Sequence, residues 1–109
     1  MLRSKSEVFI DQALFMNNIP YRYECKLVLN GNNIYPDFTL LHPVTGKILY
    51  WEHFGMMDDF KYAQKALNKI ELYNRAGIIP GIDLIMTFET DNKPFMYINA
   101  EAKVKEYFF

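Results

Sequence analysis

The chain has 109 residues, of which 50% are hydrophobic and 17% aromatic, and its formal net charge is −1 at pH 7. This apolar content excludes an intrinsically disordered chain and suffices for one compact domain over residues 1–109. The near-neutral charge argues against a non-specific nucleic-acid binder, unless the lysines and arginines gather on one face. The single cysteine, Cys25, excludes an internal disulfide and suits a small buried residue in a strand.

The sequence contains no pattern of a secretory leader and no apolar run long enough to cross a membrane. We therefore expect a cytoplasmic protein without a membrane partner.

The first part of the chain predicts one helix followed by two strands. Ser4 and Glu7 have the spacing of a capping box, which favours a helix over residues 4–17. Strand-forming residues follow at 21–28 and again at 34–41, and an Asn-Gly turn signal separates the two runs.

The rest of the chain alternates between strands and helices. Residues 48–54 are apolar or aromatic on both faces, which predicts a central strand. A long helix is expected at 57–76, a fourth strand at 81–88 and a last helix at about 99–108.

This order of elements predicts an α/β fold with a mixed four-stranded sheet flanked by helices. The first three strands are joined by short turns and should pair antiparallel. The fourth strand follows a helical crossover, so it can pair in parallel with its neighbour.

Two acidic residues should meet on the second and third strands. If His42 pairs with Lys47, a four-residue loop closes the hairpin. Asp37 then stands directly opposite Glu52, with Cβ atoms roughly 4.5–5.5 Å apart on the same face of the sheet.

Two readings of this pair are open. Adjacent carboxylates repel each other, and a divalent cation such as Mg²⁺ or Mn²⁺ would remove the repulsion. Alternatively, the register differs by one residue, or a lysine neutralises one acid in a structural ion pair. Lys26 is the candidate lysine if Leu29 pairs with Ile34 in the first hairpin.

The run Tyr35-Pro36-Asp37-Phe38, followed on the next strand by Trp51-Glu52-His53-Phe54-Gly55, resembles the PD-(D/E)XK nuclease superfamily. It is most similar to the branch of small endonuclease-like domains whose second motif reads Glu-His-x-Gly. The resemblance covers nearly the whole chain. It implies a restriction-endonuclease-like αβββαβ core and Mg²⁺-dependent hydrolysis of phosphodiester bonds in DNA.

The resemblance also implies roles for particular residues. Asp37 and Glu52 would ligate the catalytic metal, together with the backbone carbonyl of His53. Glu7 matches an additional acid that many members carry on the first helix, although its place in the capping box gives it a structural role as well. One position departs from the motif, because Phe54 stands where the family has a lysine.

A lysine of the long helix could replace the missing one. We expect Lys61 and Lys65 to point to solvent, whereas Lys69 lies at the edge of the core-facing stripe and could reach over the active face of the sheet. The alternative is an ordinary lysine whose stem packs and whose ammonium group is solvated. The stripe itself should contain Ala63, Ala66, Leu67, Ile70, Tyr73 and Asn74.

The side chain of His53 should lie on the face opposite Glu52, where we expect it to be packed or hydrogen-bonded, beside Trp51 in the core. Two other functions compete with an active nuclease. One is a catalytically inactive nuclease fold that binds DNA or protein. The other is a homodimerising interaction domain, which apolar residues outside the inward helix stripes favour. These residues are Val8, Phe9, Phe15 and Leu72.

Overall fold

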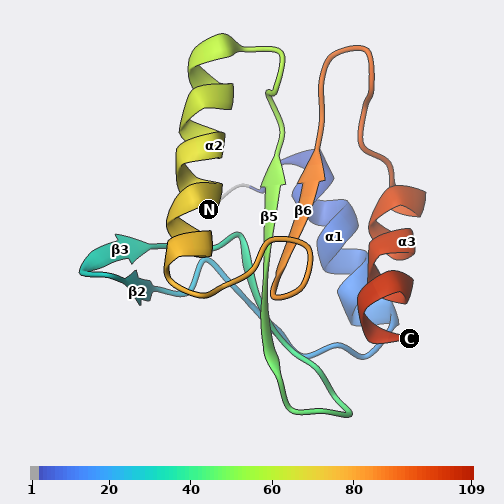
Figure 1. Ribbon diagram of the computed structural model, residues 1–109. Helices are drawn as coiled ribbons and strands as arrows, with labels where there is room; N and C mark the ends of the chain where they lie inside the picture. Colours follow the sequence, from blue (N-terminus) through green and yellow to red (C-terminus); the bar gives the residue numbers. More distant parts are fainter. Residues whose placement is uncertain (1–2) are drawn as a thin grey trace.

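The computed structural model describes residues 3–109, which contain three helices and six strands in two sheets (Figure 1). The main sheet has the strand order β1-β4-β5-β6, and β2 and β3 form a separate hairpin. The elements are α1 (Lys5–Met16), β1 (Tyr21–Tyr23), β2 (Leu27–Leu29), β3 (Asn32–Ile34), β4 (Phe38–Leu41), β5 (Ile48–Phe54), α2 (Phe60–Arg75), β6 (Leu84–Phe88) and α3 (Tyr97–Phe108).

The predicted α/β class and mixed sheet are confirmed. Strand β4 pairs antiparallel with β1 and β5, whereas β6 pairs in parallel with β5 after the crossover through α2. Strand β5 is therefore central, as its apolar sequence predicts. In the main sheet the chain order is α1, β1, β4, β5, α2, β6, so a helix, three strands, a helix and a strand follow one another as the sequence predicts.

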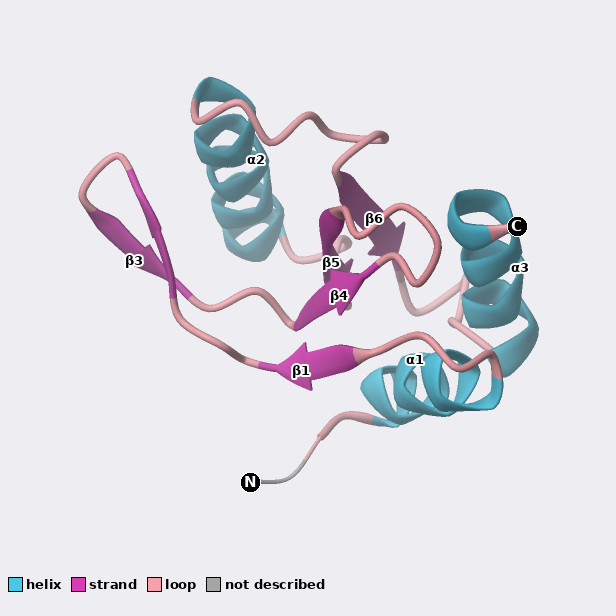
Figure 2. Cartoon of the chain, turned by 90° about the horizontal axis from the view of Figure 1, so that it is seen from below, coloured by secondary structure: helices cyan, strands magenta, loops and turns pink. Residues whose placement is uncertain are grey.

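The helices cover both faces of the sheet (Figure 2). Helices α1 and α3 pack together on one face, over the fully buried Trp51 of β5. Helix α2 covers the other face, where Tyr73 is fully buried against Leu84 of β6 and the β2–β3 hairpin. None of the three helices in the described range is long and apolar enough to cross a membrane.

The strands predicted over 21–28 and 34–41 are wrong in extent, because the chain breaks each of them in two. Glu24 has a positive φ of 50°, which no strand residue adopts, and β1 ends just before it. The β2–β3 hairpin then pairs Leu27 with Ile34, rather than Leu29 with Ile34. Asn30 and Gly31 both have positive φ, as a tight two-residue hairpin turn requires.

Helix α2 begins later and faces the sheet differently than the sequence predicts. Asp59 accepts a hydrogen bond from the Tyr62 N–H and so caps a helix that starts at Phe60, not at residue 57. Ala66 and Tyr73 are buried as expected, but Leu67 is 60% exposed and Asn74 is exposed. The buried stripe is therefore rotated toward the side of the helix that carries Lys69.

The apolar residues predicted to lie outside the helix stripes divide into two groups. Val8 and Phe15 are exposed, by 38% and 73%. Phe9 and Leu72 instead pack against the core clusters, so the prediction for these two is wrong. The α1 capping box is confirmed, because Ser4 and Glu7 exchange hydrogen bonds between side chain and backbone.

Candidate active site

The β4–β5 register brings the two predicted carboxylates together. Phe38 pairs with Trp51, and the His42 N–H donates to the Lys47 carbonyl at 2.8 Å, as the sequence predicts. Asp37 directly precedes β4, and the same register continued by one residue places it opposite Glu52. The α2 face of the sheet therefore carries both acids.

Glu52 is a buried acid, only 2% exposed, with two partners on one oxygen. The Tyr73 hydroxyl donates to Glu52 Oε2 at 2.6 Å, and Lys69 Nζ lies 2.7 Å from the same oxygen. Both partners come from α2, one turn apart. Burial and the charge of Glu52 raise the pKa of Tyr73 far above its ordinary value, so the phenol stays protonated and donates.

Asp37 is held by the strand that carries Glu52. Its Oδ2 accepts the His53 N–H at 2.7 Å. Burial, and next the negative charge of Glu52, raise the pKa of Asp37 to about 7, against a smaller lowering by the His53 N–H. Ionisation of both acids together is therefore unfavourable, and a cation bound between them would offset the repulsion of their charges.

The same register leaves the His53 carbonyl without a ladder partner. Because the His42 N–H bonds to the Lys47 carbonyl and such pairs alternate along antiparallel strands, odd-numbered residues of β5 face β4, and Pro36 falls opposite His53. Proline has no N–H to donate. The peptide oxygen of His53 therefore receives no bond from β4, beside the Asp37 carboxylate that takes the His53 N–H.

An open depression of about 220 Å³ lies over this site. Phe54 is 4% exposed and stacks on Phe88 with ring centroids 5.5 Å apart, so position 54 brings no positively charged side chain to the acids. Lys69, 33% exposed in its side chain, supplies the ammonium group instead. The depression is lined by Asp37, Glu52, His53, Phe54, Tyr62, Lys65, Ala66 and Lys69.

Glu7 and Lys26 do not join the carboxylate pair. The Glu7 carboxylate accepts the Ser4 N–H at 3.1 Å and the Tyr23 hydroxyl at 3.0 Å, although its charge contributes to the raised pKa of Asp37. Lys26 is exposed, because the shifted hairpin register carries it away from the site. Lys69 is therefore the lysine that pairs with the acid.

No group of three or more His, Cys, Asp or Glu side chains within residues 3–109 is arranged to hold a metal ion. Any metal at this site would take carboxylate oxygens from Asp37 and Glu52 and the carbonyl oxygen of His53. Oxygen donors of this kind fit Mg²⁺ or Mn²⁺, which usually retain several waters or phosphate oxygens as further ligands.

The His53 ring lies on the opposite face, as predicted, within a polar network. Its Nδ1 is 2.8 Å from Thr87 Oγ1 and its Nε2 is 3.0 Å from Glu89 Oε1. Glu89 also accepts bonds from Ser6 Oγ at 2.6 Å and from the Phe95 N–H at 2.9 Å. The network anchors the residue whose backbone N–H holds Asp37.

Tyr73, Thr87 and Glu89 complete the site, although no motif in the sequence marks them. Tyr73 could have been found, because it lies four residues after Lys69 and so on the same helix face. The places of Thr87 and Glu89 in the site depend on the parallel β5–β6 register, which puts Thr87 beside His53. Nothing in the sequence fixes that register.

No family model, curated protein or solved structure matches this chain.

Proposed function

We propose that this chain is a metal-dependent nuclease domain of the PD-(D/E)XK type, which hydrolyses phosphodiester bonds in DNA. The proposed catalytic residues are Asp37, Glu52 and Lys69, and the proposed metal is Mg²⁺ or Mn²⁺. Glu7 keeps a smaller proposed role, as a nearby acid that adds negative charge around Asp37.

The observation that carries the proposal is the pair of acids on adjacent strands. Glu52 is 2% exposed, and the pKa of Asp37 rises to about 7 because of burial and the charge of Glu52. Like charges placed opposite each other destabilise a sheet. A site that retains both acids, beside a carbonyl without a ladder partner, has the donor set that a hard divalent cation requires.

The protein side of the reaction follows from these positions. A bound divalent cation would supply Lewis acidity and lower the pKa of a coordinated water. Asp37 and Glu52 would hold the cation, and the His53 N–H fixes one oxygen of the Asp37 carboxylate beside the strand that carries Glu52. Lys69, at the open depression, would orient the attacking water or stabilise charge on the scissile phosphate.

One observation favours a second function, an inactive nuclease fold that binds DNA or protein. Without a cation, Lys69 and Tyr73 already satisfy Glu52 Oε2, which is the arrangement of a structural ion pair. Phe54 occupies the position where the family motif has its lysine. This second function predicts nucleic-acid or protein binding that is independent of divalent cations.

Calorimetric titration separates the two functions. Mg²⁺ and Mn²⁺ are titrated into the wild type, the Asp37→Asn/Glu52→Gln double variant and the control Glu71→Gln, which changes an exposed acid of α2. The nuclease proposal expects binding to wild type and control but not to the double variant. The same proteins are then incubated with duplex, single-stranded and branched DNA in Mg²⁺.

Cleavage of any DNA that requires both acids supports the nuclease. A cation-independent gel shift without cleavage supports the inactive module. Absence of cation binding both with and without DNA, together with absence of cleavage, overturns the nuclease proposal.

A further inference from the structure

The outer edge of β6 is open to another strand. Strand β6 is the last strand of the main sheet, with β5 on one side only. The Tyr50 N–H donates to the Asp83 carbonyl, and the Glu89 N–H donates to the Phe54 carbonyl. Because backbone groups alternate in direction along a strand, the odd-numbered residues of β6 face β5 and the even-numbered residues face outward.

Only part of this outward edge is covered. The turn before β6 covers Leu84, whose N–H donates to Ile79 and whose carbonyl accepts from Gly81. Within residues 3–109, the backbone N–H and carbonyl groups of Met86 and Phe88 have no protein partner on this side. These groups are a template for strand addition, the mode by which an extended peptide joins a sheet edge.

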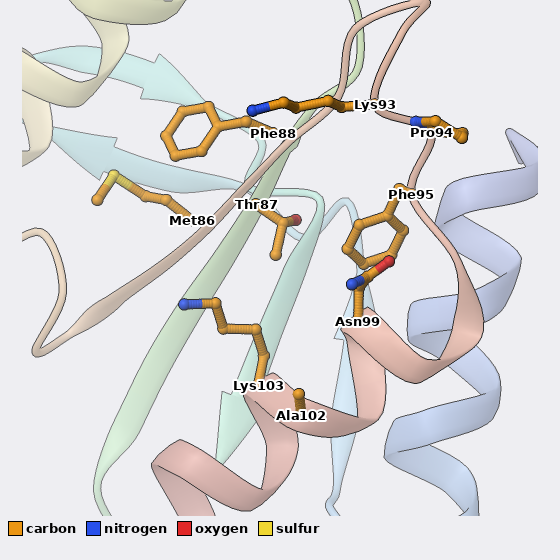
Figure 3. Close-up of a pocket in the computed structure, with 9 residues that line it drawn as sticks. All are labelled: Met86, Thr87, Phe88, Lys93, Pro94, Phe95, Asn99, Ala102 and Lys103. Carbon is orange, nitrogen blue, oxygen red and sulfur yellow. The ribbon is translucent and has the colours of Figure 1, made fainter.

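A groove of about 430 Å³ runs along this open edge, between β6 and α3 (Figure 3). The rings of Phe88 and Phe95 and the Met86 side chain give it apolar walls, which suit the alternate side chains of an added strand. The groove is lined by Met86, Thr87, Phe88, Lys93, Pro94, Phe95, Asn99, Ala102 and Lys103.

The charged and amide side chains of the groove offer hydrogen-bond donors. Lys93 stands on the loop after β6, and Lys103 reaches from α3 toward the strand (Figure 3). Asn99 Oδ1 accepts the Met96 N–H, which leaves the Asn99 NH₂ group to donate. Lys103 has a competing acid, Glu106, at 3.4 Å on the exposed side of the helix. No carboxylate is among the lining residues, so the groove is complementary to an acidic segment.

We propose that this groove binds an extended segment of another protein that carries acidic side chains. The segment pairs its backbone with Met86 and Phe88 and places a carboxylate near Lys93 and Lys103. A second copy of this chain fits less well, because pairing two β6 edges would bring the same lysines of both copies together. The interaction is separate from the proposed nuclease site, since Phe88 and Phe54 form a stacked wall between the two depressions.

Selection from a random nonapeptide display library tests the proposal. The library is selected on the wild type, on Lys93→Glu/Lys103→Glu and on Lys105→Glu, which changes an exposed lysine of α3 outside the groove. We expect acidic, strand-forming peptides to be enriched on the wild type and on the Lys105 control. The groove double variant should bind the selected peptides about tenfold or more weakly. Failure to enrich acidic peptides, or equal binding by the double variant, would overturn the proposal.

Backbone pairing is tested with the best selected peptide and with a copy that is N-methylated at alternate residues. In amide NMR spectra, we expect the unmodified peptide to shift the Met86 and Phe88 signals and the methylated copy to leave them unchanged. Equal shifts with both peptides would overturn strand addition. Sedimentation gives the remaining outcome, since a dimer that the peptide dissociates would assign this edge to a second copy instead.

Discussion

The carboxylate of Asp37 accepts the backbone N–H of His53 at 2.7 Å, and His53 directly follows Glu52. Asp37 thus takes the bond that the Pro36 carbonyl would accept in a regular ladder, and this holds its carboxylate against the backbone of the strand that carries Glu52. Burial of this carboxylate, and next the nearby negative charge of Glu52, raise the pKa of Asp37 to about 7.

We expect Asp37 to titrate near pH 7 in the metal-free protein. Its pKa is higher in the folded state than the ordinary 3.8, so the folded state binds the proton more tightly and stability falls as pH rises from about 4 to about 7. Asp37→Asn removes the charge but retains an acceptor for His53. The variant should therefore be more stable than wild type at pH 8 by about 1–3 kcal/mol, and equally stable near pH 4.

Urea denaturation at the two pH values measures this difference, and carbon NMR of the side chain follows the titration directly. Titration of Asp37 near pH 4 would contradict the prediction. Asp91→Asn, at an exposed acid in the loop after β6, is the control and should show no such difference between pH values.

Removing the Lys69 ammonium group should destabilise the metal-free protein. Lys69→Met keeps most of the packed stem and leaves the buried Glu52 without its cation. Because the lysine is one-third exposed, we expect a loss of about 1–2 kcal/mol rather than the larger cost of a fully buried pair. Lys65→Met, at an exposed lysine of the same helix, should change stability by less than about 0.5 kcal/mol.

The stability lost in Lys69→Met should be smaller when Mg²⁺ is added in excess, because a bound cation replaces the missing positive charge. Denaturation of both variants with and without Mg²⁺ measures the effect. An unchanged loss in Mg²⁺ would point to a structural ion pair and weigh against the proposed metal site.

The Tyr73 hydroxyl should stabilise the site independently of its ring. Tyr73→Phe keeps the buried ring and removes the 2.6 Å hydrogen bond to Glu52. We expect the free energy of unfolding to fall by about 1–3 kcal/mol, since the buried carboxylate loses a donor. Tyr50→Phe is the control in the same cluster, because its partly buried ring has no side-chain hydrogen bond in the described residues. Equal losses in the two variants would contradict a specific role for this hydroxyl.

The Glu89 carboxylate connects three parts of the fold, and we expect this connection to stabilise the protein. It accepts bonds from Ser6 on α1, His53 on β5 and the Phe95 N–H before α3. Burial alone would raise the pKa of Glu89, but the bonds from Ser6, Phe95 and His53 lower it below its ordinary value. The stability that these bonds contribute is therefore present at neutral pH and is lost as pH falls through the lowered pKa.

Glu89→Ala should lower the free energy of unfolding by about 1–3 kcal/mol at pH 7, because three donors lose their acceptor. Glu106→Ala, at an exposed acid of α3, is the matched control and should change it by less than about 0.5 kcal/mol. Thermal denaturation followed by circular dichroism compares them. Similar melting of wild type and Glu89→Ala would mean that the network does not hold the elements together.

Local rules account for much of the fold. The Ser4–Glu7 capping box starts α1, and the turn between His42 and Lys47 sets the β4–β5 register. Because side chains alternate along a strand, that one register places Asp37 opposite Glu52. The position of Lys69 at the margin of the helix stripe follows from helical periodicity in the same way.

The sequence predicts the first hairpin and its Asn-Gly turn, but not its register or its separation from the main sheet, because packing decides these two features. Glu24 adopts a positive φ that residue preferences disfavour, and the chain leaves the main sheet there so that Leu29 and Ile34 can pack against Tyr73. The residues of 21–28 are typical of a strand throughout, so nothing in their composition predicts the break at Glu24. As a result, Lys26 lies away from the acid that it could have neutralised.

The sequence by itself determined the order of elements, the mixed sheet and the meeting of Asp37 with Glu52, because each depends on periodicities and turns that act over a few residues. The tertiary structure decided which groups complete the site. The hydroxyl of Tyr73 and the Thr87–Glu89 anchor of His53 come from segments brought together by the α2 crossover and the parallel β5–β6 register. The same crossover brings the ammonium of Lys69, whose place at the helix margin the sequence predicts, onto Glu52. Such contacts depend on the rotation of a helix over a sheet, which is set by the packing of the whole core rather than by any local pattern.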